Sequence, residues 1–138
     1  MIVETIVESV RISKAPNTRV VVLKERGGER YTTIWIGPFE AEAIAMQLQK
    51  VEIARPLPYD LMKTIIAGLG GEVQRVVVTK IGDIFVGTII VQLPGKEISF
   101  DARASDAINL AVRANAPVFV DESLLMEFPS SPSSNAAQ

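Results

Sequence analysis

Acidic side chains fall at the predicted starts of three helices, and their residue types and positions are the ones in this chain best suited to chemistry. Asp101 and Asp106 flank the point where a predicted strand gives way to the third helix. Glu40 and Asp60 fall in the first turns of the two earlier helices. Carboxylate oxygens are the ligands that the hard cations Mg²⁺ and Mn²⁺ prefer, so these four acids are the candidate metal ligands.

Two arginines lie next to these acids in the sequence. Arg55 precedes Asp60, and Arg103 lies between Asp101 and Asp106. A guanidinium can clamp a phosphate or stabilise developing negative charge, so both arginines join the two later aspartates as catalytic candidates. A structural explanation stays open, because an acid in the first turn offsets the helix dipole and an Arg–Asp pair can fix a loop.

The residue types that the chain lacks narrow its chemistry further. It has no cysteine and no histidine. This excludes thiolate or imidazole zinc sites, Ser-His and Cys-His nucleophile pairs, and an imidazole general base. The formal net charge of −2 is unfavourable for holding a polyanion through the overall field, so any contact with nucleic acid needs a local patch.

Hydrophobic periodicity predicts the elements that must position these residues. In the first half, runs rich in valine and isoleucine predict strands at 2–12, 19–24 and 30–36. Two helices follow and begin at Pro38 and Pro58, because proline suits the first turn of a helix. Apolar residues at helical spacing then predict one core-facing side for each helix.

The second half predicts an antiparallel meander followed by a third helix. Extended runs separated by two tight turns cover 73–81, 84–93 and 96–100. The helix at 105–114 is apolar nearly all round, which predicts burial on more than one side. Its second cover could be the sheet, another helix or a neighbouring subunit, and the last option motivates the prediction of a homo-oligomer. A short strand at 117–120 follows.

These elements predict a single compact α/β domain of the α+β type, with a mostly antiparallel sheet and three main helices. We place this domain at 1–128 and a disordered tail at 129–138, where no large apolar side chain repays the entropy of ordering. No apolar run is long enough for a membrane span, and acids occupy the N-terminus where a signal peptide needs a basic start. We therefore expect a cytoplasmic protein with no membrane partner.

Several motifs resemble those of one known family. In the first half they are Ile34-Trp35-Ile36-Gly37, Glu40-Ala41, Ala43-Ile44-Ala45, Arg55-Pro56-Leu57 and Asp60-Leu61. In the second half they are Asp101-Ala102-Arg103, Ser105-Asp106-Ala107-Ile108, Leu110-Ala111-Val112-Arg113 and Ala116-Pro117-Val118-Phe119-Val120. In this order, over roughly Val3 to Met126, the chain resembles the bifunctional nuclease domain family.

The resemblance implies a compact α/β domain that assembles as a homodimer or other homo-oligomer and cleaves both DNA and RNA. We accordingly predict a nuclease of low sequence specificity that hydrolyses phosphodiester bonds. Because no softer ligand is present, carboxylates would hold the assisting Mg²⁺ or Mn²⁺. Two positions depart from the family pattern: Pro58-Tyr59 stands where members commonly carry Thr-His, and Ala104 stands where proline is common.

The alternative is a non-catalytic, homo-oligomeric binding or regulatory module with the same fold. In that case the acid–arginine pairs are structural and the apolar helix forms a subunit contact. The negative net charge, the missing histidine and the lack of a basic stripe with interleaved aromatics favour this alternative. The physiological substrate, the metal and the number of subunits do not follow from the sequence.

Overall fold

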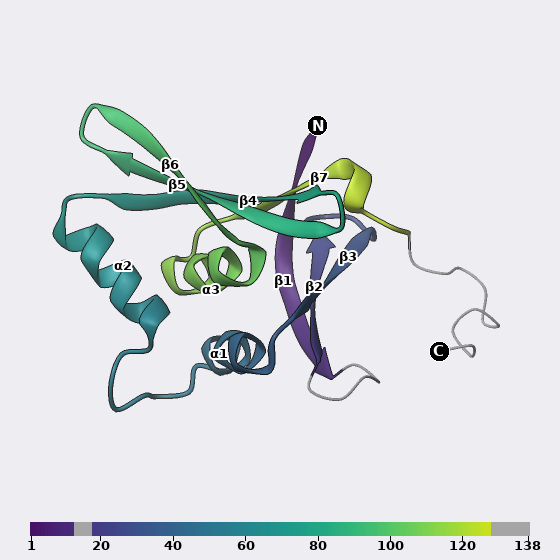
Figure 1. Cartoon of the computed structure of the whole chain (residues 1–138), viewed down its shortest axis with the longest axis horizontal. Coiled ribbons are helices and arrows are strands. Elements are labelled where there is room, and N and C mark those ends of the chain that lie inside the picture. Colours follow the sequence, from purple (N-terminus) through teal and green to yellow (C-terminus); the bar gives the residue numbers. More distant parts are fainter. Residues whose placement is uncertain (13–17, 128–138) are drawn as a thin grey trace.

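A seven-stranded sheet curves around three helices, which lie on its concave side (Figure 1). The computed structural model describes residues 1–12 and 18–127. The elements in chain order are β1 (Ile2–Ile12), β2 (Arg19–Glu25), β3 (Tyr31–Ile36), α1 (Pro38–Leu48), α2 (Pro58–Gly68), β4 (Glu72–Ile81), β5 (Ile84–Leu93), β6 (Lys96–Arg103), α3 (Ala104–Ala114), β7 (Val118–Asp121) and the short 3₁₀ helix η1 (Glu122–Leu124).

The last strand joins two antiparallel units into one sheet. The strand order is β3-β2-β1-β7-β4-β5-β6, so β7 lies between the N-terminal unit and the β4–β6 meander. Of the described strand pairs, β4 with β7 is parallel and the others are antiparallel. This arrangement confirms the predicted α+β class with three helices and a mostly antiparallel sheet.

Helix α3 lies directly on the sheet because the strand beneath it carries a glycine. A Cβ added at Gly87 of β5 would lie 2.6 Å from the Cβ of Ala107, closer than two carbon atoms can pack. The helix ends at Asn115, whose φ of 53° is the left-handed conformation that asparagine tolerates well. These two residues fix where α3 sits and where the chain turns toward β7.

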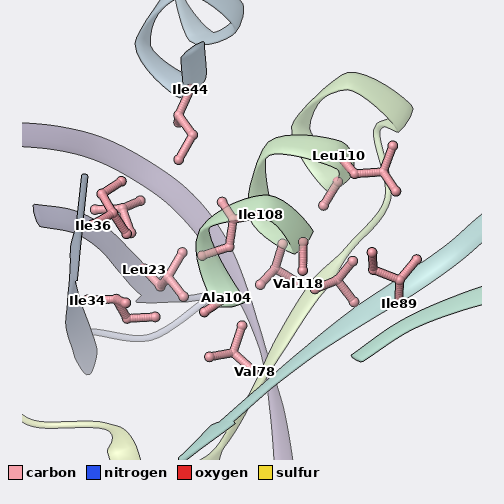
Figure 2. Packing of buried hydrophobic residues seen from close by; sticks show 14 of the residues in the cluster. Leu23, Ile34, Ile36, Ile44, Val78, Ile89, Ala104, Ile108, Leu110 and Val118 are labelled. Atoms are coloured by element: carbon pink, nitrogen blue, oxygen red, sulfur yellow. The ribbon is translucent and has the colours of Figure 1, made fainter. Parts of the chain in front are cut away.

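The hydrophobic core fills the space between α3, α1 and the concave face of the sheet (Figure 2). Ile108 and Leu110 of α3 are fully buried, as are Leu23 of β2 and Ile44 of α1. Helix α3 packs against α1, α2, β4 and β5, so the sheet and the two other helices supply its cover within one chain. The homo-oligomer therefore stays a prediction, because the apolar helix that motivated it, α3, is covered without a second subunit.

Helix α2 differs from the other two helices because none of its residues is buried. It packs against α3 and β4 at the side of the domain, where Figure 1 shows it standing apart from the β5–β6 arm. Leu61 and Ile65 of α2 are each about half exposed. An apolar surface of this helix therefore borders open space.

Some boundaries differ from the predicted ones. Strand β6 extends to Arg103, so Asp101 lies inside the strand opposite Thr88 and not at its end. Residues 128–138, which include the predicted tail, lie outside the described part of the chain. No helix within the described ranges combines the length and the apolar character that crossing a membrane requires.

Candidate functional site

The centre of the candidate site is a two-pronged ion pair at the start of α3. Arg103, the residue that precedes the helix, donates from Nε to Oδ2 of Asp106 at 2.7 Å and from Nη2 to Oδ1 at 2.8 Å. The pair forms because Asp106 lies three residues further on, in the first turn. Two parallel hydrogen bonds fix the plane of the guanidinium as well as its position.

Two further side chains bring the starts of all three helices together at this pair. The hydroxyl of Tyr59, in the first turn of α2, donates to Oδ1 of Asp106 at 2.7 Å. Nη2 of Arg103 also lies 3.4 Å from Oε2 of Glu40, in the first turn of α1. We call Glu40, Tyr59, Arg103 and Asp106 the rim cluster. Its two carboxylates face one guanidinium.

The surroundings of the rim cluster set the protonation of its members. Partial burial raises the pKa of Asp106, but hydrogen bonds from Arg103 and Tyr59 outweigh this and hold the pKa below its ordinary value of 3.8. Partial burial, with the hydrogen bond to Asp106, raises the pKa of the Tyr59 hydroxyl well above 10.0. Near neutral pH, Asp106 is therefore an anion and Tyr59 keeps its proton.

A second ion pair is more deeply buried and lies near the end of α3. Arg113 is 5% exposed and donates from Nε to Oδ1 of Asp60 at 2.9 Å. Its other nitrogens donate to the carbonyl and side-chain oxygens of Asn109 and to the carbonyl oxygen of Ala43. The guanidinium lies 5.4 Å from the centre of the Tyr59 ring. We call Asp60, Asn109 and Arg113 the buried cluster.

The rim cluster opens onto a cleft of about 710 Å³ between α2 and the β5–β6 arm. Tyr59, Arg103 and Asp106 line one part of it, together with Asp101. The rest is apolar, with Met62, Ile65 and Ile66 on α2, Leu110 on α3, and Ile89 and Phe100 on the sheet. A concave, largely apolar space with a few polar groups at one end is the usual form of a ligand site.

The structure brings some of the predicted site residues together and separates others. Asp106, Arg103 and Glu40 share the rim cluster. Asp60 belongs to the buried cluster through Arg113, while Asp101 lines the cleft without joining either network. Arg55 is exposed in the loop before α2.

The described residues therefore do not assemble the four-carboxylate metal site as a unit. Across residues 1–12 and 18–127, no three acidic side chains form a group that could hold a metal ion. Three of the four acids, Glu40, Asp60 and Asp106, are instead paired with arginines. The roles of the individual residues and the need for Mg²⁺ or Mn²⁺ stay predictions.

Three residues of the two clusters, Tyr59, Asn109 and Arg113, were absent from the predicted set. A signal for two of them exists in the sequence. Asp106, Asn109 and Arg113 follow the i, i+3, i+7 spacing and so form one polar stripe on a helix that is otherwise almost wholly apolar. Such a stripe on a buried helix must find polar partners, because unpaired buried polar groups are costly.

Comparison with known proteins identifies the family. The sequence profile of the Bifunctional nuclease domain matches residues 21–132. The chain belongs to the bifunctional nuclease domain family. This confirms the resemblance seen in the sequence motifs. Tyr59, which departs from the motif pattern of that resemblance, lies within the rim cluster.

Relatives with this domain occur in bacteria and plants. Uncharacterized protein Rv1829 of Mycobacterium tuberculosis (strain ATCC 25618 / H37Rv) is 38% identical over 125 residues, which are 90% of this chain and 74% of that protein. Bifunctional nuclease 2 of Oryza sativa subsp. japonica is 33% identical over 114 residues, and its namesake in Arabidopsis thaliana is 31% identical. Both matches cover 80% of this chain and 35% of the plant protein. The chain thus spans about a third of the length of each of these plant relatives.

Proposed function

We propose that this bifunctional nuclease domain protein hydrolyses phosphodiester bonds in DNA and RNA, with low sequence specificity, at the rim cluster. The observation that carries the proposal is the state of Arg103. Its guanidinium is held in place by Asp106, yet its side chain is 65% exposed at the edge of a cleft. Membership of the family and the names of the plant relatives support a nucleic acid as the substrate.

Arg103 is proposed to contact the phosphate. Nε and Nη2 are taken up by Asp106 and Glu40, whereas the two N–H groups of Nη1 have no acceptor among the described residues. They can donate to a phosphate oxygen and stabilise the charge that develops there when the bond to the leaving oxygen breaks. Asp106 and Tyr59 are positioning residues, because they orient the guanidinium and do not themselves contact the phosphate.

Asp101 is the proposed acceptor for the proton of the attacking water. It lines the same cleft as Arg103 and is exposed. Among the four predicted acids, it is the one that belongs to neither the rim cluster nor the buried cluster. Water oxygen would attack phosphorus as its proton passes to the Asp101 carboxylate, and the leaving oxygen would take a proton from solvent. A divalent cation would lower the pKa of such a water, and this predicted requirement enters the test below.

The experiment is cleavage of fluorescent DNA and RNA oligonucleotides by wild type, Asp101→Asn and Asp106→Asn, each with Mg²⁺, with Mn²⁺ and with a chelator. We expect each substitution to lower kcat/KM by about 100-fold or more. Asp83→Asn is the control, because Asp83 is an exposed aspartate in the β4–β5 turn. Full activity in both site variants would contradict the proposal, and activity in the chelator would contradict the metal requirement.

The non-catalytic binding module is the second candidate. Asp60 and Asp106 are each paired with an arginine, which is what a purely structural role requires. The same assay separates the two candidates, because a binding module shows no metal-stimulated cleavage that Asp106→Asn removes. Oligonucleotide binding without cleavage by wild type would favour the module.

A further inference from the structure

The apolar part of the cleft has no role in the hydrolysis described above. It occupies most of a space of about 710 Å³. Two of its side chains remain strongly exposed, Ile65 of α2 at 50% and Phe100 of β6 at 49%. Leaving such groups in water is unfavourable, and a concave apolar wall beside polar groups is typical of a site for a small apolar or aromatic group.

The polar end of the cleft indicates what kind of group this is. Arg103 offers positive charge with two uncommitted N–H groups, which suits a phosphate. Asp106 lies on the same cleft and offers carboxylate oxygens, which accept from the exocyclic amines of bases. Phe100 offers an aromatic face, on which any base can stack. A nucleotide combines the three complementary features in one molecule.

We infer that the cleft binds the unpaired base of the nucleotide whose phosphate Arg103 contacts, with the base between Phe100 and the apolar side of α2. This inference rests on the proposed function and adds to it a base-binding site. It also limits the substrate, because a base inside a duplex must first leave its stack to enter a pocket. Strands with unpaired nucleotides are therefore the preferred substrates.

The charge of the protein supports this mode of binding. With a formal net charge of −2, the chain gains little from general attraction to phosphates. Base stacking is independent of net charge and tolerates any sequence, so it supplies affinity without specificity. The site thereby accounts for the low sequence specificity of the proposed nuclease.

Two exposed residues of α2 provide a matched pair of variants. Ile65 lines the cleft and is 50% exposed, whereas Leu61 is 51% exposed on the same helix and does not line it. Ile65→Glu places a charge in the base site, and Leu61→Glu adds the same charge outside it. Because α2 has no buried residue, both variants are expected to fold. Phe100→Ala tests the stacking surface separately.

The measurements are KM and kcat on a single-stranded oligonucleotide and on its duplex, together with fluorescence-anisotropy binding of that single strand. We expect Ile65→Glu and Phe100→Ala to weaken binding and raise KM on the single strand by about tenfold, with kcat within about twofold of wild type. Leu61→Glu should match wild type within about twofold. Adenosine monophosphate should compete with the single strand in wild type and not in Ile65→Glu.

The outcomes distinguish this inference from the proposed function. Cleavage with the same KM in Ile65→Glu and Leu61→Glu, or equal KM for single strand and duplex, would overturn the base site and leave the nuclease. Binding that depends on Ile65 without any cleavage would support the base site and overturn the nuclease. If sedimentation shows that Ile65→Glu alone dissociates an oligomer while single-strand binding is unchanged, the cleft is a subunit contact and the inference fails.

Discussion

Helix α3 carries two Arg–carboxylate pairs that differ mainly in their exposure to water. Arg103 and Asp106 lie at its start, where the arginine side chain is 65% exposed, while Arg113 lies near its end and its side chain is 3% exposed. Arg113 donates hydrogen bonds to Asp60, to Asn109 and to the carbonyl oxygen of Ala43. Arg103 keeps donors for a ligand. The same residue pairing is thus buried and fully bonded at one end of the helix, and exposed at the edge of a cleft at the other.

The largest expected effect is on stability, from breaking the buried pair. Arg113→Met should lower the free energy of unfolding by about 3–5 kcal/mol, because it leaves the Asp60 carboxylate and the Asn109 oxygen without their partner. Urea unfolding followed by circular dichroism measures this change. Arg26→Met is the control, since Arg26 is 66% exposed and should change stability by less than about 1 kcal/mol. Equal losses in the two variants would contradict the distinction between the clusters.

Tyr59→Phe should have an intermediate effect, because Tyr59 contacts both clusters. The substitution removes the 2.7 Å hydrogen bond to Asp106 while keeping the ring near Arg113. We expect unfolding free energy to fall by about 0.5–1.5 kcal/mol and kcat/KM to fall up to about tenfold. Activity equal to wild type in Tyr59→Phe would show that the hydroxyl does not position Asp106.

Arg103→Ala should lower the free energy of unfolding by less than Arg113→Met or Tyr59→Phe does. The pair is largely exposed, so its contribution is screened by solvent and amounts to less than about 1 kcal/mol. Urea unfolding beside Arg113→Met provides the comparison. A loss as large as that of Arg113→Met would show that the rim cluster is mainly a structural feature.

The smallest predicted effect is a pH dependence from Asp106. Its pKa is lower in the folded state than its ordinary value of 3.8, so its ionised form stabilises the fold above that pH. This contribution is lost as pH falls through the lowered pKa. The difference in unfolding midpoint between wild type and Asp106→Asn should therefore shrink below about pH 4. A difference that grows on acidification would contradict the ion pair.

Much of the fold could be predicted from local patterns, because alternation, proline and glycine act over short stretches. The strand 2–12 and the helix starts at Pro38 and Pro58 agree with the structure. The neighbours of α3 could not be predicted, since an apolar helix accepts a sheet, a helix or a subunit equally well. The extension of β6 to Arg103 was missed because its pairing with β5 depends on long-range register.

The candidate site was predicted in part. Glu40, Arg103 and Asp106 were predicted from their residue types and their positions near helix starts, and they meet in the rim cluster. Sequence position alone could not show which acid pairs with Arg103 and which with Arg113, because the pairing depends on how α1 and α2 pack on α3. Tyr59 was missed because only the folded helix start brings its hydroxyl to Asp106.

The most direct test of the central claim compares two arginines of nearly equal exposure. Arg103→Ala and Arg26→Ala each remove an exposed guanidinium, 65% and 66% exposed respectively, but only Arg103 lies at the cleft. Single-turnover cleavage of one oligonucleotide by both variants gives the answer. We predict that Arg103→Ala is at least about 100-fold slower than wild type, while Arg26→Ala stays within about twofold. Equal rates for the two folded variants would contradict the assignment of the rim cluster as the hydrolytic site.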